Sequence, residues 1–190
     1  VLAGGEGENT LKGGKGDDII DGGEGSDIIK AGAGNDTVIY DADDTLIHGG
    51  KGFDVLVAND PDGVDIDMSK GSNINGFEAV IGGDSANDKL TISLGKTFNQ
   101  NHDLDGNRAK NDDQVAEFFA LGIEEIDASH LQGFQYQAAT PVTLDQDMQD
   151  KLGLDGSEII TAYSFTKGGK EVIIYTDASF DGDFTGVNEV

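Results

Sequence analysis

The sequence has no cysteine, no tryptophan and only two prolines, and it has few basic residues. Without cysteine there can be no disulfide scaffold, and there are no thiolate ligands for zinc or copper. The 12 Lys and Arg residues are outnumbered by 37 Asp and Glu, which gives a formal net charge of −25 and a pI of about 4.1. A chain this acidic repels phosphate groups, so we expect no nucleic-acid partner and no binding to anionic membrane surfaces.

Long apolar runs are missing as well. No stretch of about 18 apolar residues occurs, so we expect no membrane insertion by this region. Residues 1–3 lead directly into glycine-rich sequence and do not form a signal peptide. We therefore expect the parent protein to extend upstream, with further copies of the pattern described next.

Glycine is abundant, and it is organised with a period of nine residues. From residue 4 to residue 57 the chain consists of six units: GGEGENTLK, GGKGDDIID, GGEGSDIIK, AGAGNDTVI, YDADDTLIH and GGKGFDVLV. The pattern is G-G-x-G-x-D-x-U-x, where U is aliphatic. Glycines at the first, second and fourth places allow positive φ angles and tight turns. A flexible linker has no reason to keep such a register, so we set the linker alternative aside.

Two other places of the unit indicate a buried side chain and a metal ligand. The eighth place is always aliphatic and predicts one inward side chain per short strand: Leu11, Ile20, Ile29, Val38, Ile47 and Leu56. The sixth place is mostly acidic: Asn9, Asp18, Asp27, Asp36, Thr45 and Asp54. Carboxylates and glycine carbonyls are hard oxygen ligands, which suit calcium and do not suit zinc or copper.

This repeat resembles the calcium-binding nonapeptide of the RTX (repeats-in-toxin) family of exported bacterial proteins. The resemblance implies a mainly β fold, in which residues 1–60 form a calcium-binding parallel β-roll, a kind of solenoid. Residues 61–190 would then form a mixed, mostly β domain with short helices, which caps the roll and carries the secretion signal. Two nonapeptides make one turn of such a roll, so equivalent residues recur every 18 positions.

The resemblance also implies how calcium is held. Each ion lies between the sixth-place side chains of alternate units and takes carbonyls from two loops, which gives about three ions in the roll. The first site comprises Asp18, Asp36, Gly14, Gly16, Ala31 and Ala33. The second comprises Asp36, Asp54, Gly32, Gly34, Gly49 and Lys51. The third comprises Asn9, Asp27, Gly5, Gly7, Gly22 and Glu24, and we expect it to be weaker because Asn9 is neutral.

The degenerate fifth unit leaves two interpretations open. A fourth site would pair Asp27 with Thr45, but the glycines are lost here and Tyr40 stands at the first place. Asp43 or Asp44 would have to supply the missing ligand. The acidic residues of this unit are therefore either a solvated bulge or an irregular calcium site.

Further ions are conceivable in residues 82–107. The segment that begins at Gly82 is either a decayed repeat, with Asp84 or Asp88 as a ligand, or an ordinary turn. The loop from Asp103 places acidic residues at alternate positions, but it lacks the glutamate that an EF-hand requires at its twelfth position.

After residue 61 the pattern predicts short strands and two short helices. We expect strands at residues 64–68, 78–81, 90–94 and 123–128, and a hairpin made of residues 160–166 and 171–176. The first helix would run from Asp112 or Asp113 to Leu121, with Phe118 and Phe119 on its apolar face. The second would follow a capping box that starts at Thr143.

We find no catalytic motif and expect no enzyme. His48, His102 and His130 stand apart, and the sequence has neither a zincin motif nor a nucleophile elbow.

The RTX resemblance instead implies a chain that the type I secretion machinery of a Gram-negative bacterium exports to the medium or the cell surface. Such a chain is unfolded at low cytosolic calcium and folds outside. As the parent we favour an adhesin that acts in cell adhesion and biofilm formation, with a host or cell-surface ligand as candidate partner. The alternatives are a sugar- or peptide-binding module in residues 62–190, or an accessory domain of a secreted hydrolase or toxin.

Overall fold

The computed structural model describes residues 1–58, 60–69, 73–83, 87–92, 115–128, 133–178, 180 and 184–185. These residues form mostly β-strands, and they include one helix, α2 (Gln146–Leu152). The strands are β1 (Leu2–Glu6), β2 (Thr10–Lys15), β3 (Ile19–Glu24), β4 (Ile28–Ala33), β5 (Thr37–Ile39), β6 (Leu46–Lys51), β7 (Val55–Val57), β8 (Asp65–Asp67), β9 (Ile74–Asn75), β10 (Ala79–Ile81), β11 (Lys89–Thr91), β12 (Val115–Leu121), β13 (Glu125–Asp127), β14 (Gln135–Val142), β15 (Ile160–Lys167), β16 (Lys170–Thr176) and β17 (Phe184–Thr185).

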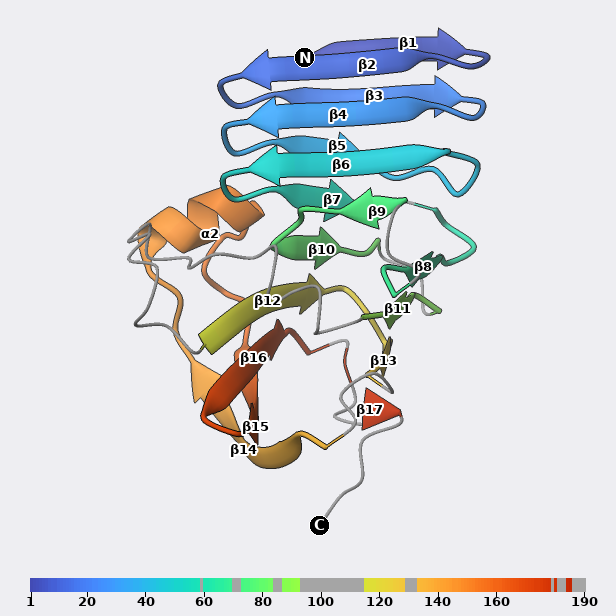
Figure 1. Ribbon diagram of the computed structural model, residues 1–190. Helices are drawn as coiled ribbons and strands as arrows, with labels where there is room; N and C mark the ends of the chain where they lie inside the picture. Colours follow the sequence, from blue (N-terminus) through green and yellow to red (C-terminus); the bar gives the residue numbers. More distant parts are fainter. Residues whose placement is uncertain are drawn as a thin grey trace.

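In the repeat segment, residues 1–58, strands from alternate nonapeptides pair in parallel. One series is β1-β3-β5-β7 and the other is β2-β4-β6, and Figure 1 shows them stacked like rungs. Leu2 pairs with Ile20, and Leu11 pairs with Ile29, so the predicted 18-residue recurrence is confirmed. The eighth-place aliphatic side chains of both series meet in one core, and each is at most 8% exposed.

Parallel pairing continues beyond the point where the nonapeptide register ends. The nine-stranded sheet runs in the order β1-β3-β5-β7-β10-β12-β16-β15-β14. Val55 of β7 pairs with Ala79, Ala79 pairs with Phe119, and Phe119 pairs with Tyr175. The other series continues with β9, which pairs with β6, while β8, β11, β13 and β17 form a separate parallel sheet. The division at residue 60 stays a prediction, but the sheet crosses it without interruption.

The predicted elements after residue 61 agree with the structure in most places. Strands occur at β8, β10, β11 and β13, and β15 and β16 form the predicted antiparallel hairpin. The predicted helix up to Leu121 is wrong, because residues 115–121 form strand β12, whose apolar residues are buried on both faces. Its proposed caps, Asp112 and Asp113, lie outside the described residues. Helix α2 is present, but its N-cap is Asp145 rather than Thr143.

Helix α2 lies against the outer face of the long sheet. Leu152 belongs to a second apolar cluster with Phe53, Val55, Ala79 and Phe119, separate from the main core. The helix ends at Gly153, whose φ of 70° closes it in the left-handed conformation. Outward-facing residues of β7 and β10 are therefore covered, whereas Ile19 in β3 is 50% exposed.

No helix in the described part of the chain is long and apolar enough to span a membrane.

Candidate metal site

Carboxylates placed directly before the strands form a ladder of hydrogen bonds. Each rung is a carboxylate oxygen that accepts the backbone N–H of the equivalent residue on the neighbouring strand. Oδ1 of Asp36 accepts the backbone N–H of Asp18 at 2.8 Å, and Oδ1 of Asp54 accepts that of Asp36 at 2.9 Å. On the other side of the repeat segment, Oδ1 of Asp27 accepts the N–H of Asn9 at 2.6 Å. The sixth-place residues that we predicted to share ions are thus brought together in pairs, 18 residues apart.

The ladder includes three carboxylates that the nine-residue register does not predict as sixth-place residues. Asp44 fills the rung in the degenerate fifth unit, where its Oδ1 accepts the N–H of Asp27 at 3.1 Å. Thr45, the sixth residue by count, does not fill it. Glu78 and Asp88 continue the pattern after residue 60. Their common signal in the sequence is an acidic residue one or two positions before a short apolar strand.

Four aspartates of the repeat ladder each have one oxygen without a partner. Oδ2 of Asp27, Asp36, Asp44 and Asp54 is buried and accepts no hydrogen bond. Asp27, Asp36 and Asp54 are at most 1% exposed as whole residues. A buried carboxylate oxygen without a donor or a cation costs free energy, so a ligand at each of these positions would offset a real penalty.

The pKa values show the same uncompensated charge. Burial, together with the neighbouring Asp36 and Asp17 carboxylates, raises the pKa of Asp54 to about 7. Burial likewise raises the pKa of Asp44 to about 6, and it raises the pKa of Asp36 above its usual value of 3.8. Negative charge on these buried carboxylates is therefore costly, and a divalent cation would neutralise it.

The backbone supplies oxygen atoms at the same places. A Cβ atom added to Gly13 would clash with the carbonyl oxygen of Ala31 and lie 2.7 Å from Oδ2 of Asp18. Gly14 and Gly16 have φ angles of 109° and 93°, which the turns require. The absence of side chains at the repeat glycines thus leaves a cradle in which a carbonyl and a carboxylate oxygen converge.

The predicted carbonyl donors lie within or directly after the strands of neighbouring rungs, and their binding to an ion stays a prediction. The carbonyls of Glu24, Ala33 and Lys51 accept the N–H groups of Gly7, Gly16 and Gly34. A carbonyl oxygen has two lone pairs and can bind an ion as well. Gly5, Gly7, Gly14, Gly16, Gly32 and Gly34 have positive φ angles, and Gly22, Ala31 and Gly49 lie in the strands β3, β4 and β6.

The donor set fits calcium. Among the described residues no group of three or more His, Asp or Glu side chains converges on one point, so an ion here would have to draw on backbone carbonyls. A mixture of carboxylate and carbonyl oxygens is what calcium accepts at six- to eight-fold coordination. The individual ligand assignments stay predictions. Asp84 and Asp103, further candidates in residues 82–107, lie outside the described residues.

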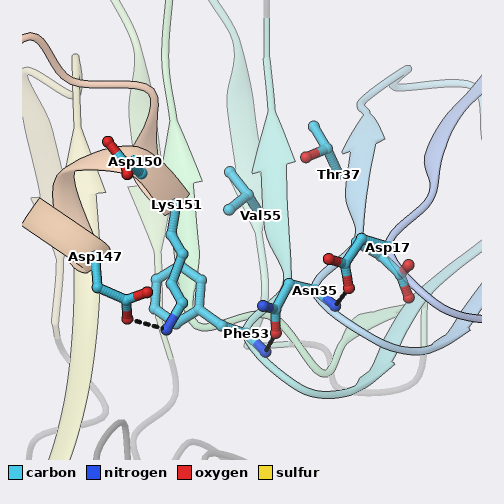
Figure 2. A pocket seen from close by; sticks show the side chains of 9 residues that line it. Asp17, Asn35, Thr37, Phe53, Val55, Asp147, Asp150 and Lys151 are labelled. Carbon is cyan, nitrogen blue, oxygen red and sulfur yellow. Dashed lines mark hydrogen bonds and ion pairs between the residues drawn. The ribbon is translucent and has the colours of Figure 1, made fainter.

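A small cavity of about 330 Å³ lies between α2 and the ends of the repeat strands. Figure 2 shows a second row of hydrogen bonds along its floor, from the N–H of Asn35 to Asp17 and from the N–H of Phe53 to the Asn35 side chain. On the helix side, Lys151 pairs with Asp147 at 2.7 Å and lies over the Phe53 ring. The helix therefore contacts the loop between β6 and β7, within the last regular unit.

A known family matches the first part of the chain. The sequence model of the RTX calcium-binding nonapeptide repeat fits residues 3–38, in four copies. The chain carries RTX repeats. These repeats imply a calcium-binding domain of a secreted protein. The match includes the rungs of Asp18, Asp27 and Asp36, whereas Asp54 and Glu78 lie beyond it. No curated protein and no solved structure matches the chain.

Proposed function

We propose that the chain is a calcium-dependent RTX region from the C-terminal part of a type I-secreted bacterial adhesin. Residues 1–60 act as a parallel β-roll, and residues 61–190 cap it. The observation that carries this proposal is the series of buried, unpartnered Oδ2 atoms on Asp27, Asp36 and Asp54. The carbonyl oxygen of Gly76 lies close to the Asp54 carboxylate, as that of Ala31 lies close to the Asp18 carboxylate.

Three sites follow from the paired rungs. Asp18 and Asp36 would hold one ion, Asp36 and Asp54 a second, and Asn9 and Asp27 a third, each with the loop carbonyls given above. When bound, calcium supplies the positive charge that the buried carboxylates lack. The ladder hydrogen bonds fix Oδ1 of Asp27, Asp36 and Asp54, which leaves Oδ2 of each available as a ligand.

Folding is coupled to export in this proposal. Calcium that binds only the folded chain contributes its binding free energy to folding. With a net charge of −25 the metal-free chain repels itself, which favours an expanded state in the calcium-poor cytosol. Outside the cell, sites of about 10⁻⁴–10⁻³ M affinity would fill and the chain would fold.

A calcium titration followed by far-UV circular dichroism tests the proposal, with magnesium at equal ionic strength as control. We expect a cooperative change from coil to β-structure near millimolar calcium and no such change with magnesium. A chain that is already fully folded in metal-free buffer, and that binds no calcium by calorimetry, would overturn the proposal. Replacing Asp18, Asp36 and Asp54 together by Asn should abolish both the folding transition and secretion.

The adhesin assignment rests on the length of the segment after the repeats, which is more than a brief secretion tail. A second candidate, a sugar- or peptide-binding module, is favoured by the cavity beside α2, which combines an aromatic ring with acidic groups. A glycan and peptide array separates the two, because a cap without a ligand should bind nothing. We propose no enzymatic activity; hydrolase motifs upstream in the parent protein would instead indicate an accessory domain of an enzyme.

A further inference from the structure

Glu78 occupies the position of a sixth-place aspartate although it lies outside the repeats. It directly precedes β10, as Asp54 directly precedes β7, and these two strands pair in parallel. Its Oε2 accepts the backbone N–H of Asp54 at 2.7 Å, and Oδ1 of Asp54 accepts that of Asp36 at 2.9 Å. The step between rungs is 24 residues here instead of 18, so the nonapeptide register does not reveal it.

The backbone around Glu78 also reproduces the cradle of the repeats. A Cβ atom added to Gly49 would clash with the carbonyl oxygen of Gly76 and lie 2.8 Å from Oδ2 of Asp54. A Cβ atom added to Gly13 likewise meets the carbonyl oxygen of Ala31 and Oδ2 of Asp18. Gly76 thus corresponds to Ala31, the first residue of its unit, and its carbonyl oxygen lies in the equivalent position beside the carboxylate.

The charge at this rung is buried and has no cation beside it. Asp54 is 0% and Glu78 5% exposed, and Oδ2 of Asp54 has no hydrogen-bond partner. No ion pair between described residues involves either side chain. The loop from Gly76 to Glu78 is shorter than the corresponding part of a repeat, and the longer glutamate side chain bridges the difference.

The Asp88 carboxylate, which precedes β11 in the separate four-stranded sheet, provides the contrast. Its Oδ1 accepts the N–H of Val64 at 2.9 Å and its Oδ2 accepts the N–H of Gly83 at 3.0 Å. Glu124 then accepts the N–H of Asp88 at 2.7 Å, the same ladder bond as that of Glu78. At Asp88 a backbone donor therefore satisfies the oxygen that is left without a partner at Asp54.

We propose that Asp54 and Glu78, with the carbonyls of Gly50, Gly52 and Gly76, form an additional calcium site. It lies at the end of the series of rungs that runs through Asp36 and Asp54. In the separate sheet, the Asp88 rung is held by hydrogen bonds alone. This inference rests on the proposed calcium-binding function of the repeats. It assigns a ligand role to a residue outside them. The site lacks one loop carbonyl, so its affinity is lower than that of the repeat sites.

The test compares Glu78→Gln with the matched control Glu124→Gln, both in the full chain. Each substitution removes one charge and keeps an oxygen that can accept the ladder N–H. The number of bound calcium ions is measured by equilibrium dialysis with metal analysis and by native mass spectrometry, after circular dichroism has shown that each variant is folded in saturating calcium. We expect Glu78→Gln to bind one ion fewer than the unmodified chain and Glu124→Gln to bind the same number.

The outcomes separate the two proposals. If the unmodified chain binds no calcium, the proposed function fails; if it binds calcium and Glu78→Gln binds equally many ions, only the additional site fails. Loss of an ion in Glu124→Gln would refute the hydrogen-bonded character of the Asp88 rung. If Glu78→Gln does not fold, Glu78→Asp keeps the charge on a shorter side chain. It should weaken the last binding step about 10-fold, a typical cost of disturbing a metal site, and an unchanged step would overturn the proposal.

Discussion

Acid should partly replace calcium in folding this chain. In the metal-free folded state burial holds the pKa of Asp54 at about 7, whereas the ordinary value is 3.8. A group whose pKa is raised on folding stabilises the folded state when protonated, and this stability is lost as the pH rises through the folded-state pKa. We therefore expect the metal-free chain to become more stable as the pH falls from 8 to 5.5.

The magnitude follows from the two pKa values. At pH 8 Asp54 is ionised in both states, and at pH 5.5 it is protonated only in the folded state. At about 1.4 kcal/mol per pH unit below the folded-state pKa, the gain from Asp54 is roughly 2 kcal/mol. Glu78, whose pKa burial raises to about 8, acts in the same direction. Ordinary surface carboxylates titrate near pH 4 and contribute little in this range.

The assay is urea unfolding monitored by far-UV circular dichroism at pH 8.0 and 5.5. The buffers are freed of metal on a chelating resin, because soluble chelators lose affinity in acid. If the chain is unfolded at pH 8, the β signal itself should grow on acidification. Asp54→Asn should reduce the effect, and in saturating calcium the sign should reverse because protons then compete with the ion. Equal or lower stability at pH 5.5 in metal-free buffer would refute the reasoning.

Three further predictions concern the core, the cradle and the helix. Ile29→Ala should cost about 2–5 kcal/mol, since Ile29 is 0% exposed, and should raise the calcium concentration needed for half-folding; an unchanged midpoint would contradict its core role. Gly13→Ala should weaken calcium binding measured by calorimetry, because its Cβ would meet the Ala31 carbonyl, whereas Gly16→Ala adds a Cβ into open space and should cost only about 1 kcal/mol of backbone strain. Leu152→Ala, in a residue that is 4% exposed, should lower the free energy of urea unfolding by about 2–4 kcal/mol, and no loss would mean that α2 does not stabilise the sheet.

The regular part of the fold follows from local rules in the sequence. The eighth-place aliphatics could be predicted because every residue of a repeat sees the same neighbours, and the RTX resemblance implied the 18-residue pairing. In the degenerate unit, counting by nine residues points to position 45, but Asp44 accepts the N–H of Asp27. A side chain can reach this hydrogen bond from one residue earlier. Glu78 could not be found by register, since its rung is set by a loop of different length.

The wrong helix has a related cause. The sequence of residues 115–121 contains apolar residues at helical spacing, but it also forms a short, nearly continuous apolar run. Such a run suits a strand buried on both faces equally well, and periodicity alone does not separate the two. Tertiary pairing decided the outcome, because β12 lies between β10 and β16. Strand β14, exposed and containing Pro141, had no apolar pattern that would have predicted it.

The continuous sheet has a consequence for the way the connections between rungs can vary. Ladder partners are 18 residues apart in the repeats, then 24 and 36 residues apart towards the C-terminus. Loop-closure entropy grows only with the logarithm of loop length, so the widest of these connections costs about 0.6 kcal/mol more to close than a repeat turn. Insertions between the later rungs are thus cheap at equilibrium, and their cost is in rate, because distant partners meet late. The strands of the repeat segment, whose partners are 18 residues apart, should therefore pair first. The strands with longer connections should then add to the edge of this preformed sheet.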